Sequence, residues 1–212
     1  MSIHHPTPES CVYIVDDDPS VLRALSRLLS SAGYEVKAFD SPRDFLREHD
    51  PGVSGCALLD VGMAELDGLA VQQALLHDDS HRPVIFITGH DDANTGVRAV
   101  KAGAFDYLTK PVQDTALLAV VQAAIESDTE SRRKNDELRQ LKSLLNHVTP
   151  REIEIMQHVV RGRLNKQIAF DLGIVEKTVK VHRARVMEKL NVRSVAELVR
   201  VAQRLGITND AI

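Results

Sequence analysis

The sequence predicts an α/β doubly wound domain with a five-stranded parallel sheet, joined by a helical linker to an all-α helix-turn-helix domain. Three observations lead to this fold class. Short apolar runs alternate with helical patterns over residues 11–125, and a nearly unbroken helical pattern follows over residues 126–147. Residues 148–212 combine short helical segments with glycine-containing turns, while residues 1–10 are polar and contain proline, which predicts a frayed tail.

Five apolar runs predict the strands of the sheet. Helical stretches separate them, so successive strands should be parallel, with right-handed crossovers that place helices on both faces. The runs are Val12–Val15, Tyr34–Phe39, Cys56–Leu59, Val84–Ile87 and Tyr107–Thr109.

Capping signals predict where several helices begin and end. Asp18-Pro19 provides a cap followed by proline at the first helical position. Thr149–Glu152 and Ser194–Glu197 both read as capping boxes. The expected helices of the C-terminal part end or turn at the glycines Gly162, Gly173 and Gly206.

The linker pattern is open to two interpretations. Apolar residues recur at helical spacing both before and after a polar stretch that runs from Ser127 to Glu137. We expect either one helix that extends into the linker or two helices with a soft joint.

Charge is divided unevenly along the chain. The net charge is −9 over residues 1–125, 0 over residues 126–147 and +5 over residues 148–212. The basic part is a candidate for binding nucleic acid, although a solvated protein surface can carry the same excess. No apolar run has the length of a membrane span and the N-terminus does not resemble a signal peptide, so we expect a cytoplasmic protein without a membrane partner. Cys11 and Cys56 lie in or beside apolar strand patterns, which favours buried thiols over a redox site.

Polar side chains gather at the carboxyl ends of the predicted strands. Five residues end or directly follow such a run: Asp16, Asp17, Asp60, Thr88 and Lys110. Ligands bind at this edge of open α/β sheets. Loops are polar in general, but that accounts for one or two of these residues and not for three acids with a threonine and a lysine.

Three gathered carboxylates would repel one another, and a divalent cation removes that cost. Carboxylate oxygens and a backbone carbonyl suit Mg²⁺ or Mn²⁺. One carboxylate can then attack a phosphoryl group, because this transfer needs mainly alignment and charge neutralisation. Lys110 would neutralise phosphoryl charge and Thr88 would offer a hydroxyl.

The segments that carry these residues resemble the receiver domain of two-component response regulators, which has a flavodoxin-like, CheY-like fold. The resemblance covers about residues 10–125 and rests on Ile14–Asp18, Leu58–Asp60, Ile85–Gly89 and Lys101–Pro111. It implies that Asp60 accepts phosphate from the phosphohistidine of a sensor histidine kinase. It also implies a metal site formed by Asp16, Asp17, Asp60 and the backbone carbonyl of Gly62.

The same resemblance assigns the switch residues. Lys110 would bind the phosphate, Thr88 would be the switch hydroxyl, and Tyr107 would change rotamer as Thr88 moves. The Lys110-Pro111 peptide is expected to be cis.

The segment after Asp60 departs from the family, which often has a larger residue at Gly62 and usually proline at Ala64. A bare Gly62 leaves room for water and predicts an altered lifetime of the phosphorylated state. The alternative is that Gly62 serves a local turn with positive φ.

Residues 148–205 resemble the LuxR-type helix-turn-helix of the FixJ/NarL subfamily. The resemblance rests on Asn165–Ala169, Thr178–Arg183 and Lys189–Ser194, and more loosely on Leu145–Glu152. It implies base contacts from Lys180, Val181, Ala184 and Arg185, and phosphate contacts from Lys166, Lys177, Thr178 and Lys189. With Val179 facing inward, helical spacing turns Lys177, Val181, Ala184 and Glu188 outward. Such a face suits the major groove of double-stranded DNA, although a solvated surface is the alternative.

Four side chains of the sequence have simpler explanations than a functional role. Val175 stands where the family often has a capping serine, so this helix end lacks a side-chain cap. We interpret His182 as a packed structural residue. His77 and His81 have a metal-like spacing, but a helix end and an exposed loop are the better interpretation.

The resemblance implies a homodimer on phosphorylation, formed through the fourth helix, fifth strand and fifth helix, with RNA polymerase as a further partner. Two other functions remain open. A phosphatase of the haloacid-dehalogenase type would need a second acid where Gly62 stands. The other is a DNA-binding regulator whose receiver is switched by a partner or a ligand instead of phosphate. Such a receiver would not need the three aspartates together with Thr88 and Lys110.

Overall fold

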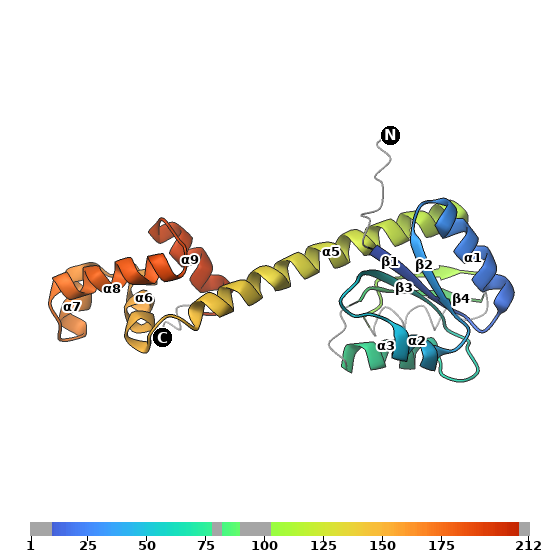
Figure 1. Cartoon of the computed structure of the whole chain (residues 1–212), viewed down its shortest axis with the longest axis horizontal. Helices are drawn as coiled ribbons and strands as arrows, with labels where there is room; N and C mark the ends of the chain where they lie inside the picture. Colours follow the sequence, from blue (N-terminus) through green and yellow to red (C-terminus); the bar gives the residue numbers. More distant parts are fainter. Residues whose placement is uncertain (1–9, 78–81, 90–102, 208–212) are drawn as a thin grey trace. The chain divides into compact units, whose positions relative to one another are not determined.

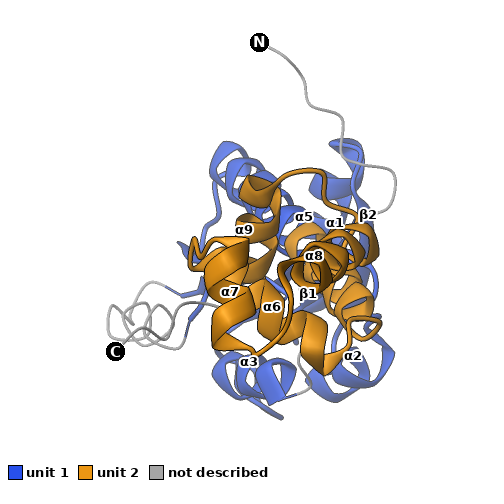
Figure 2. Cartoon of the chain, turned by 90° about the vertical axis from the view of Figure 1, so that its left-hand side faces the viewer, with its two compact units in different colours: residues 1–132 blue, residues 133–212 orange. Residues whose placement is uncertain are grey.

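The structure is a computed structural model that describes residues 10–77, 82–89 and 103–207 (Figure 1). The chain divides into two compact units, Met1–Arg132 and Arg133–Ile212 (Figure 2). Most of the expected tail, His81 and the segment expected to hold the fourth helix lie outside the described residues. None of the helices in the described part combines the length and apolar character that a membrane span requires.

The first unit contains the predicted five-stranded parallel sheet, in the order β2-β1-β3-β4-β5. Helices α2 and α3 cover one face of this sheet, whereas α1 and α5 cover the other (Figure 1). The elements are β1 (Ser10–Val15), α1 (Pro19–Ser31), β2 (Glu35–Phe39), α2 (Pro42–Glu48), β3 (Ser54–Asp60), α3 (Gly68–His77), β4 (Val84–Thr88), β5 (Asp106–Thr109) and α5 (Asp114–Leu145). Ser10 was expected in the tail, but it pairs with Ser54 and opens β1.

Side chains of the central strands alternate between two cores, as the period of a strand requires. Tyr13 and Val15 of β1 pack into the core under α2 and α3, around Phe45. Val12 and Ile14 pack into the core under α1 and α5. Cys11 and Cys56 are buried free thiols, and burial raises the pKa of Cys56 to about 12. Neither cysteine is therefore placed for redox chemistry.

The connection between the two units is helical without a break. Helix α5 runs from Asp114 to Leu145, so the interpretation as two helices with a soft joint is wrong. The division between the units falls inside this helix, after Arg132.

The second unit consists of four further described helices around one apolar core. They are α6 (Pro150–Val160), α7 (Asn165–Asp171), α8 (Glu176–Lys189) and α9 (Val195–Arg204). The capping box of Thr149 and Glu152 is confirmed. The box expected at Ser194 forms only in part, because the Glu197 carboxylate accepts from the Arg193 amide instead. Gly173 adopts φ 64°, which lets the chain turn tightly between α7 and α8.

Candidate functional sites in the two units

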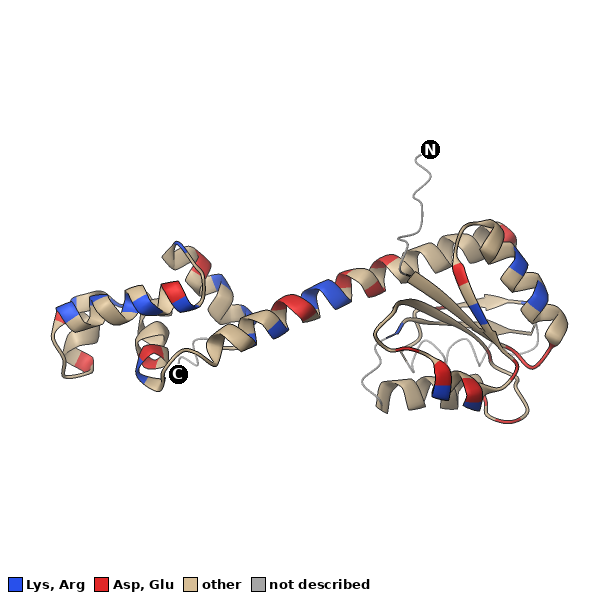
Figure 3. Cartoon of the chain, in the orientation of Figure 1, with Lys and Arg blue, Asp and Glu red and all other residues tan. Residues whose placement is uncertain are grey.

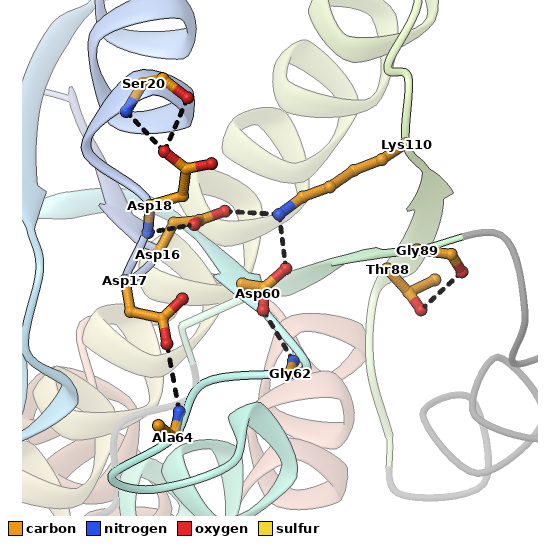
Figure 4. Close-up of polar contacts among 10 residues, drawn as sticks. All are labelled: Asp16, Asp17, Asp18, Ser20, Asp60, Gly62, Ala64, Thr88, Gly89 and Lys110. Atoms are coloured by element: carbon orange, nitrogen blue, oxygen red, sulfur yellow. Dashed lines mark hydrogen bonds and ion pairs between the residues drawn. The ribbon is translucent and has the colours of Figure 1, made fainter.

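Strand register brings the predicted polar residues to one edge of the sheet. Val15 pairs with Leu59, Asp60 with Ile87, and Thr88 with Thr109. The parallel strands therefore end together, and the residues that end or follow them meet at that edge. Figure 4 shows the residues that end or follow these strands at this edge: Asp16, Asp17, Asp60, Thr88 and Lys110.

Lys110 bridges two buried carboxylates. Its Nζ lies 2.7 Å from Asp60 Oδ1 and 2.8 Å from Asp16 Oδ2. Asp16 is 2% exposed and Asp60 is 8% exposed, so their negative charges need a compensating cation. Burial by itself lowers the pKa of Lys110, but the two carboxylates outweigh it and raise that pKa above its ordinary value. Lys110 therefore remains an ammonium.

Asp17 lies beside this pair with a different partner. Its Oδ2 accepts a hydrogen bond of 3.2 Å from the amide of Ala64, which lies in the loop after Asp60 (Figure 4). Within the described residues, no three acidic, histidine or cysteine side chains are grouped closely enough to hold a metal ion. Asp17 would have to rotate from Ala64 to join Asp16 and Asp60 around a cation.

The donor set nevertheless fits a hard cation. Asp16 and Asp60 present buried carboxylates, and Asp17 is an exposed carboxylate of the same turn. Mg²⁺ prefers such oxygen ligands and keeps several waters when it binds them. Lys110 supplies the positive charge between the two buried acids in this structure.

Thr88 and Tyr107 lie on β4 and β5, the strands on which they were expected. Thr88 ends β4 with its side chain near the site, and its Oγ1 donates to the Gly89 carbonyl at 3.2 Å. Tyr107 of β5 is 44% exposed. The Lys110-Pro111 peptide is cis, as predicted.

Two glycines shape the loop after Asp60. The Gly62 amide donates to Asp60 Oδ2 at 2.7 Å, and Gly62 is not among the residues with positive φ, so the turn explanation for this glycine is wrong. Gly68 was not singled out from the sequence. A Cβ there would lie 2.5 Å from the Asp60 carbonyl oxygen and 2.9 Å from Phe86 Cε1, so α3 approaches β3 this closely only with glycine.

The second unit presents the predicted helix-turn-helix. Val179 and Val186 of α8 are buried, while Lys177, Lys180, Val181, Ala184 and Arg185 are exposed. Lysine and arginine recur along α8, as Figure 3 shows. Lys166 is exposed on α7 and Thr178 is half-buried. As predicted, Val175 precedes α8 without a side-chain cap.

Two residues of α8 have surroundings that the sequence did not reveal. Lys189 is paired with the buried Glu152, whose Oε2 lies 2.6 Å from its Nζ. His182 is half-buried, and its Nδ1 is enclosed without a hydrogen-bond partner in the described part of the chain. The packed interpretation of His182 agrees with this burial. Val181 and Ala184 are also exposed on this helix, next to Lys180 and Arg185 in the sequence.

A sheet with this carboxyl edge, joined to a helix-turn-helix, defines a regulator with a signal-receiving unit and a DNA-binding unit. Two family models match the chain. The response regulator receiver domain matches residues 12–122, and the luxR family of bacterial regulatory proteins matches residues 146–202. The chain therefore belongs to the two-component response regulators of the FixJ/NarL subfamily, and it is a transcriptional regulator rather than a conventional enzyme.

Relatives match over nearly the full length. Nodulation protein W of Bradyrhizobium diazoefficiens is 44% identical over 94% of this chain and 88% of the relative. Response regulator protein TmoT of Ectopseudomonas mendocina is 43% identical over 95% and 92%. Transcriptional regulatory protein FixJ of Bradyrhizobium diazoefficiens is 36% identical over 96% of this chain and all of the relative.

Solved structures of both units together are also similar. A low-resolution structure of the response regulator StyR has a TM-score of 0.83 at 42% identity and covers 92% of this chain and 99% of the other. Full-length FixJ from B. japonicum has a TM-score of 0.58 at 36% identity, with coverage of 96% and 100%.

Proposed function

We propose that phosphorylation of Asp60 by a sensor histidine kinase in the cytoplasm controls dimerisation and DNA binding of this regulator. One observation carries the proposal. The Asp60 carboxylate ends a buried strand at the ligand-binding edge of the sheet, with the Lys110 ammonium 2.7 Å from one oxygen and the Gly62 amide 2.7 Å from the other. An acceptor of phosphate needs this arrangement of a fixed nucleophile and nearby positive charge.

In the transfer, an oxygen of Asp60 forms a bond to phosphorus as the bond from phosphorus to the kinase's histidine nitrogen breaks. The imidazole leaves as the neutral ring after it takes a proton. The Lys110 ammonium lies between Asp16 and Asp60. After the transfer it would pair with one oxygen of the phosphoryl group and neutralise its charge. Thr88 would donate its hydroxyl to another oxygen, in place of its contact with the Gly89 carbonyl.

Asp16, Asp17, Asp60 and the backbone carbonyl of Gly62 would hold Mg²⁺, or Mn²⁺, at this edge. The cation supplies charge neutralisation at the attacking carboxylate and at the phosphoryl oxygens. The chain itself contributes the fixed carboxylates, because the strand ends that carry them are locked in register.

The kinase needs a surface from which to reach Asp60. A groove of about 600 Å³ lies beside Lys110, between α1 and the start of α5, and it is lined by apolar residues such as Val21, Leu25 and Pro111. We propose that a helix of the kinase docks there, which would bring its phosphohistidine to the adjacent sheet edge.

Phosphorylation would act through the residues on β4 and β5. As Thr88 moves toward the phosphoryl group, Tyr107 would turn inward from its half-exposed position and reshape the face used for dimerisation. A dimer would place two α8 helices on two DNA half-sites, and the second contact then becomes effectively intramolecular. RNA polymerase would be the partner that binds the dimer on DNA.

For DNA, we propose that the exposed face of α8 enters the major groove. Lys180, Val181, Ala184 and Arg185 would contact bases, and Lys166, Lys177, Thr178 and Lys189 would contact phosphates. The exposure of most of these residues supports the proposal, whereas Lys189 would have to leave Glu152 to reach a phosphate.

The test of phosphorylation uses the full chain, a small acyl phosphate and Mg²⁺, read out by intact mass. We expect an adduct of about 80 Da that is lost in Asp60→Asn and retained in Asp40→Asn, which changes an exposed aspartate of the same unit. Loss of the adduct in both variants, or in neither, would overturn the assignment of Asp60.

The test of switching is an electrophoretic mobility shift on genomic fragments, with and without the acyl phosphate. We expect tighter and dimeric binding after phosphorylation. If DNA affinity does not change on phosphorylation but changes when a small ligand is added, the receiver is switched by a ligand instead. Catalytic release of inorganic phosphate from phosphomonoesters would favour the phosphatase.

The lifetime of phospho-Asp60 is proposed to depend on Gly62. A Cβ at this position would lie 3.4 Å from Asp60 Oδ2, so a side chain can be added without a backbone clash. We expect Gly62→Arg to change the rate of dephosphorylation because it restricts water at the phosphoryl group. Equal rates in the variant and in the wild-type protein would contradict this proposal.

A further inference from the structure

The loop between α2 and β3 lies at the opposite edge of the sheet from Asp60, and two arginines bind it. Arg82 Nη2 donates to the carbonyls of Asp50 at 2.6 Å and Val53 at 2.9 Å. Arg132 Nη1, from α5, donates to the carbonyls of Pro51 at 2.8 Å and Gly52 at 3.2 Å. Four consecutive backbone carbonyls are therefore held by guanidinium groups.

The contact of α5 with this loop is centred on a buried carboxylate. Asp128 is 3% exposed, and its Oδ2 accepts from the Gly55 amide at 2.9 Å, Ser54 Oγ at 3.0 Å and Arg132 Nε at 2.7 Å. A carboxylate this deeply buried is stable only while its donors stay in place. One turn of α5, from Asp128 to Arg132, is thus bound to the start of β3 through several charge-assisted hydrogen bonds.

Gly55, the partner of Asp128 in β3, packs against β1 at a distance that only glycine allows. Gly55 has φ 145°, and a Cβ on it would lie 1.8 Å from the Cys11 carbonyl oxygen. From Gly55 the strand runs buried and directly to Asp60. A single seven-residue strand therefore binds α5 near one end and carries the phosphoacceptor at the other.

The boundary between the two units lies next to these contacts. It follows Arg132, which binds the loop. The polar stretch that follows in α5 contains ion pairs within the helix itself, such as Arg139 with Asp136.

We propose that Asp128 and Arg132 form a latch between the receiver and the connecting helix, and that the phosphorylation state of Asp60 reaches the DNA-binding unit through this latch. The inference rests on the proposed function, because it requires DNA binding to respond to phosphorylation. A shift of β3 on phosphorylation would change the position of the Gly55 amide and Ser54 hydroxyl, and with them the donors that keep Asp128 buried.

The test is Asp128→Asn in the full chain. The amide retains the shape of the side chain but removes the charge that Arg132 pairs with. We expect amide hydrogen exchange of residues 126–135 to become at least about tenfold faster. The ratio of DNA affinities with and without acyl phosphate, which typical allosteric coupling sets at about 5- to 150-fold, should fall to within about twofold of one. The adduct on Asp60 should form as in the wild-type protein.

Asp136→Asn is the matched control, since Asp136 is an exposed aspartate of the same helix beyond the latch. We expect this control to keep the wild-type exchange and affinity ratio. Arg132→Gln is a second variant, which keeps Asp128 and serves as the test if Asp128→Asn does not fold. We expect it to show the same faster hydrogen exchange and the same reduced affinity ratio.

The outcomes separate the latch from the proposed function. A wild-type affinity ratio of one would overturn the proposed function, and the signalling role of the latch with it. A normal wild-type ratio that persists in both latch variants would overturn the latch alone. Unchanged hydrogen exchange in both variants would likewise show that these contacts do not hold the helix.

Discussion

Glu152 and Lys189 form a buried ion pair that joins the first turn of α6 to the last turn of α8, with 2.6 Å between Oε2 and Nζ. The same Glu152 oxygen accepts from the Thr149 amide at 2.9 Å, which completes the capping box of α6. One carboxylate therefore caps α6 and fixes the end of α8 against it. The position of α8 depends on this residue, which is only 2% exposed.

We predict that this carboxylate makes the second unit lose stability as the solution becomes acidic. Burial alone raises the pKa of Glu152, but hydrogen bonds from Lys189 and Thr149 outweigh it and lower the pKa to about 2. Because the pKa is depressed in the folded state, the stabilisation is present above the ordinary pKa of a glutamate and is lost as pH falls toward about 2. It amounts to at most about 3 kcal/mol.

Thermal unfolding of Glu152→Gln between pH 2 and 7 checks this prediction. The variant should be less stable than the wild-type protein near neutral pH, and the difference should shrink as pH falls. Glu154→Gln is the control, because Glu154 is more exposed and pairs with Arg151 on the same helix. A constant difference across the pH range would contradict the assigned cause.

Lys177 and Lys189 should respond differently to alanine substitution. Lys177→Ala is expected to weaken DNA binding, to lower the slope of log affinity against log salt by about 1 and to leave stability unchanged, since Lys177 is exposed. Lys189→Ala should also lower the unfolding temperature, because it leaves Glu152 without its cation. Binding titrations at several salt concentrations, with calorimetry, measure both effects.

Lys110→Ala should destabilise the receiver most strongly when no divalent cation is present. The substitution leaves Asp16 and Asp60 buried without the ammonium that bridges them. We expect a loss of about 1–3 kcal/mol, because the side chain of Lys110 is partly exposed. Chemical unfolding with and without Mg²⁺ should show a larger stabilisation by the cation in the variant. Lys142→Ala, at an exposed position of α5, should behave as the wild-type protein.

Val175→Ser should stabilise the second unit. Val175 occupies the N-cap of α8 with φ −84° and ψ 149°, a backbone conformation in which serine can cap, but valine offers no acceptor. Its side chain is also 67% exposed, so little burial is lost. We expect a gain of about 0.5–1 kcal/mol in the free energy of unfolding. Val195→Ser replaces another exposed valine next to an existing cap and should give no comparable gain.

Gly68→Ala should lower the free energy of unfolding much more than Gly62→Ala. Both glycines nevertheless lie close to Asp60, Gly62 in the loop that follows it and Gly68 directly after that loop. A Cβ added to Gly68 would meet the Asp60 carbonyl oxygen at 2.5 Å, so α3 or β3 must move, at a cost of about 1–3 kcal/mol. A Cβ added to Gly62 would have its nearest atom 3.4 Å away, and a change within about 0.5 kcal/mol is expected. Denaturant titrations compare the two variants, and a similar loss in both would contradict this explanation.

Much of the fold could be predicted because the patterns were local. Apolar runs bounded by turns marked every strand of the described sheet, and Asp18-Pro19 and Thr149–Glu152 marked helix starts that the structure has at those positions. The gathering of Asp16, Asp60 and Lys110 was also predictable, because parallel strands that alternate with helices end at one edge.

Other contacts between distant segments were not predictable. The pairing of Glu152 with Lys189 spans 37 residues, and the bond of Asp128 to Gly55 spans 73. The sequence marked Glu152 only as part of a capping box, and Asp128 looked like an ordinary residue of a polar helical stretch. The close approach of Gly68 to Asp60 similarly depends on the path of α3 over the sheet, which no local pattern records.

The sequence by itself determined the two units, the strand ends that carry the acids and the outward face of α8, because these depend on periodicity and chain direction alone. Only the tertiary structure decided which partner each charged group finds: Asp17 the Ala64 amide, Lys189 the Glu152 carboxylate, and Asp128 the start of β3. The physical reason is that a buried carboxylate must be paired wherever it lies, but the donor that pairs it is brought there by packing.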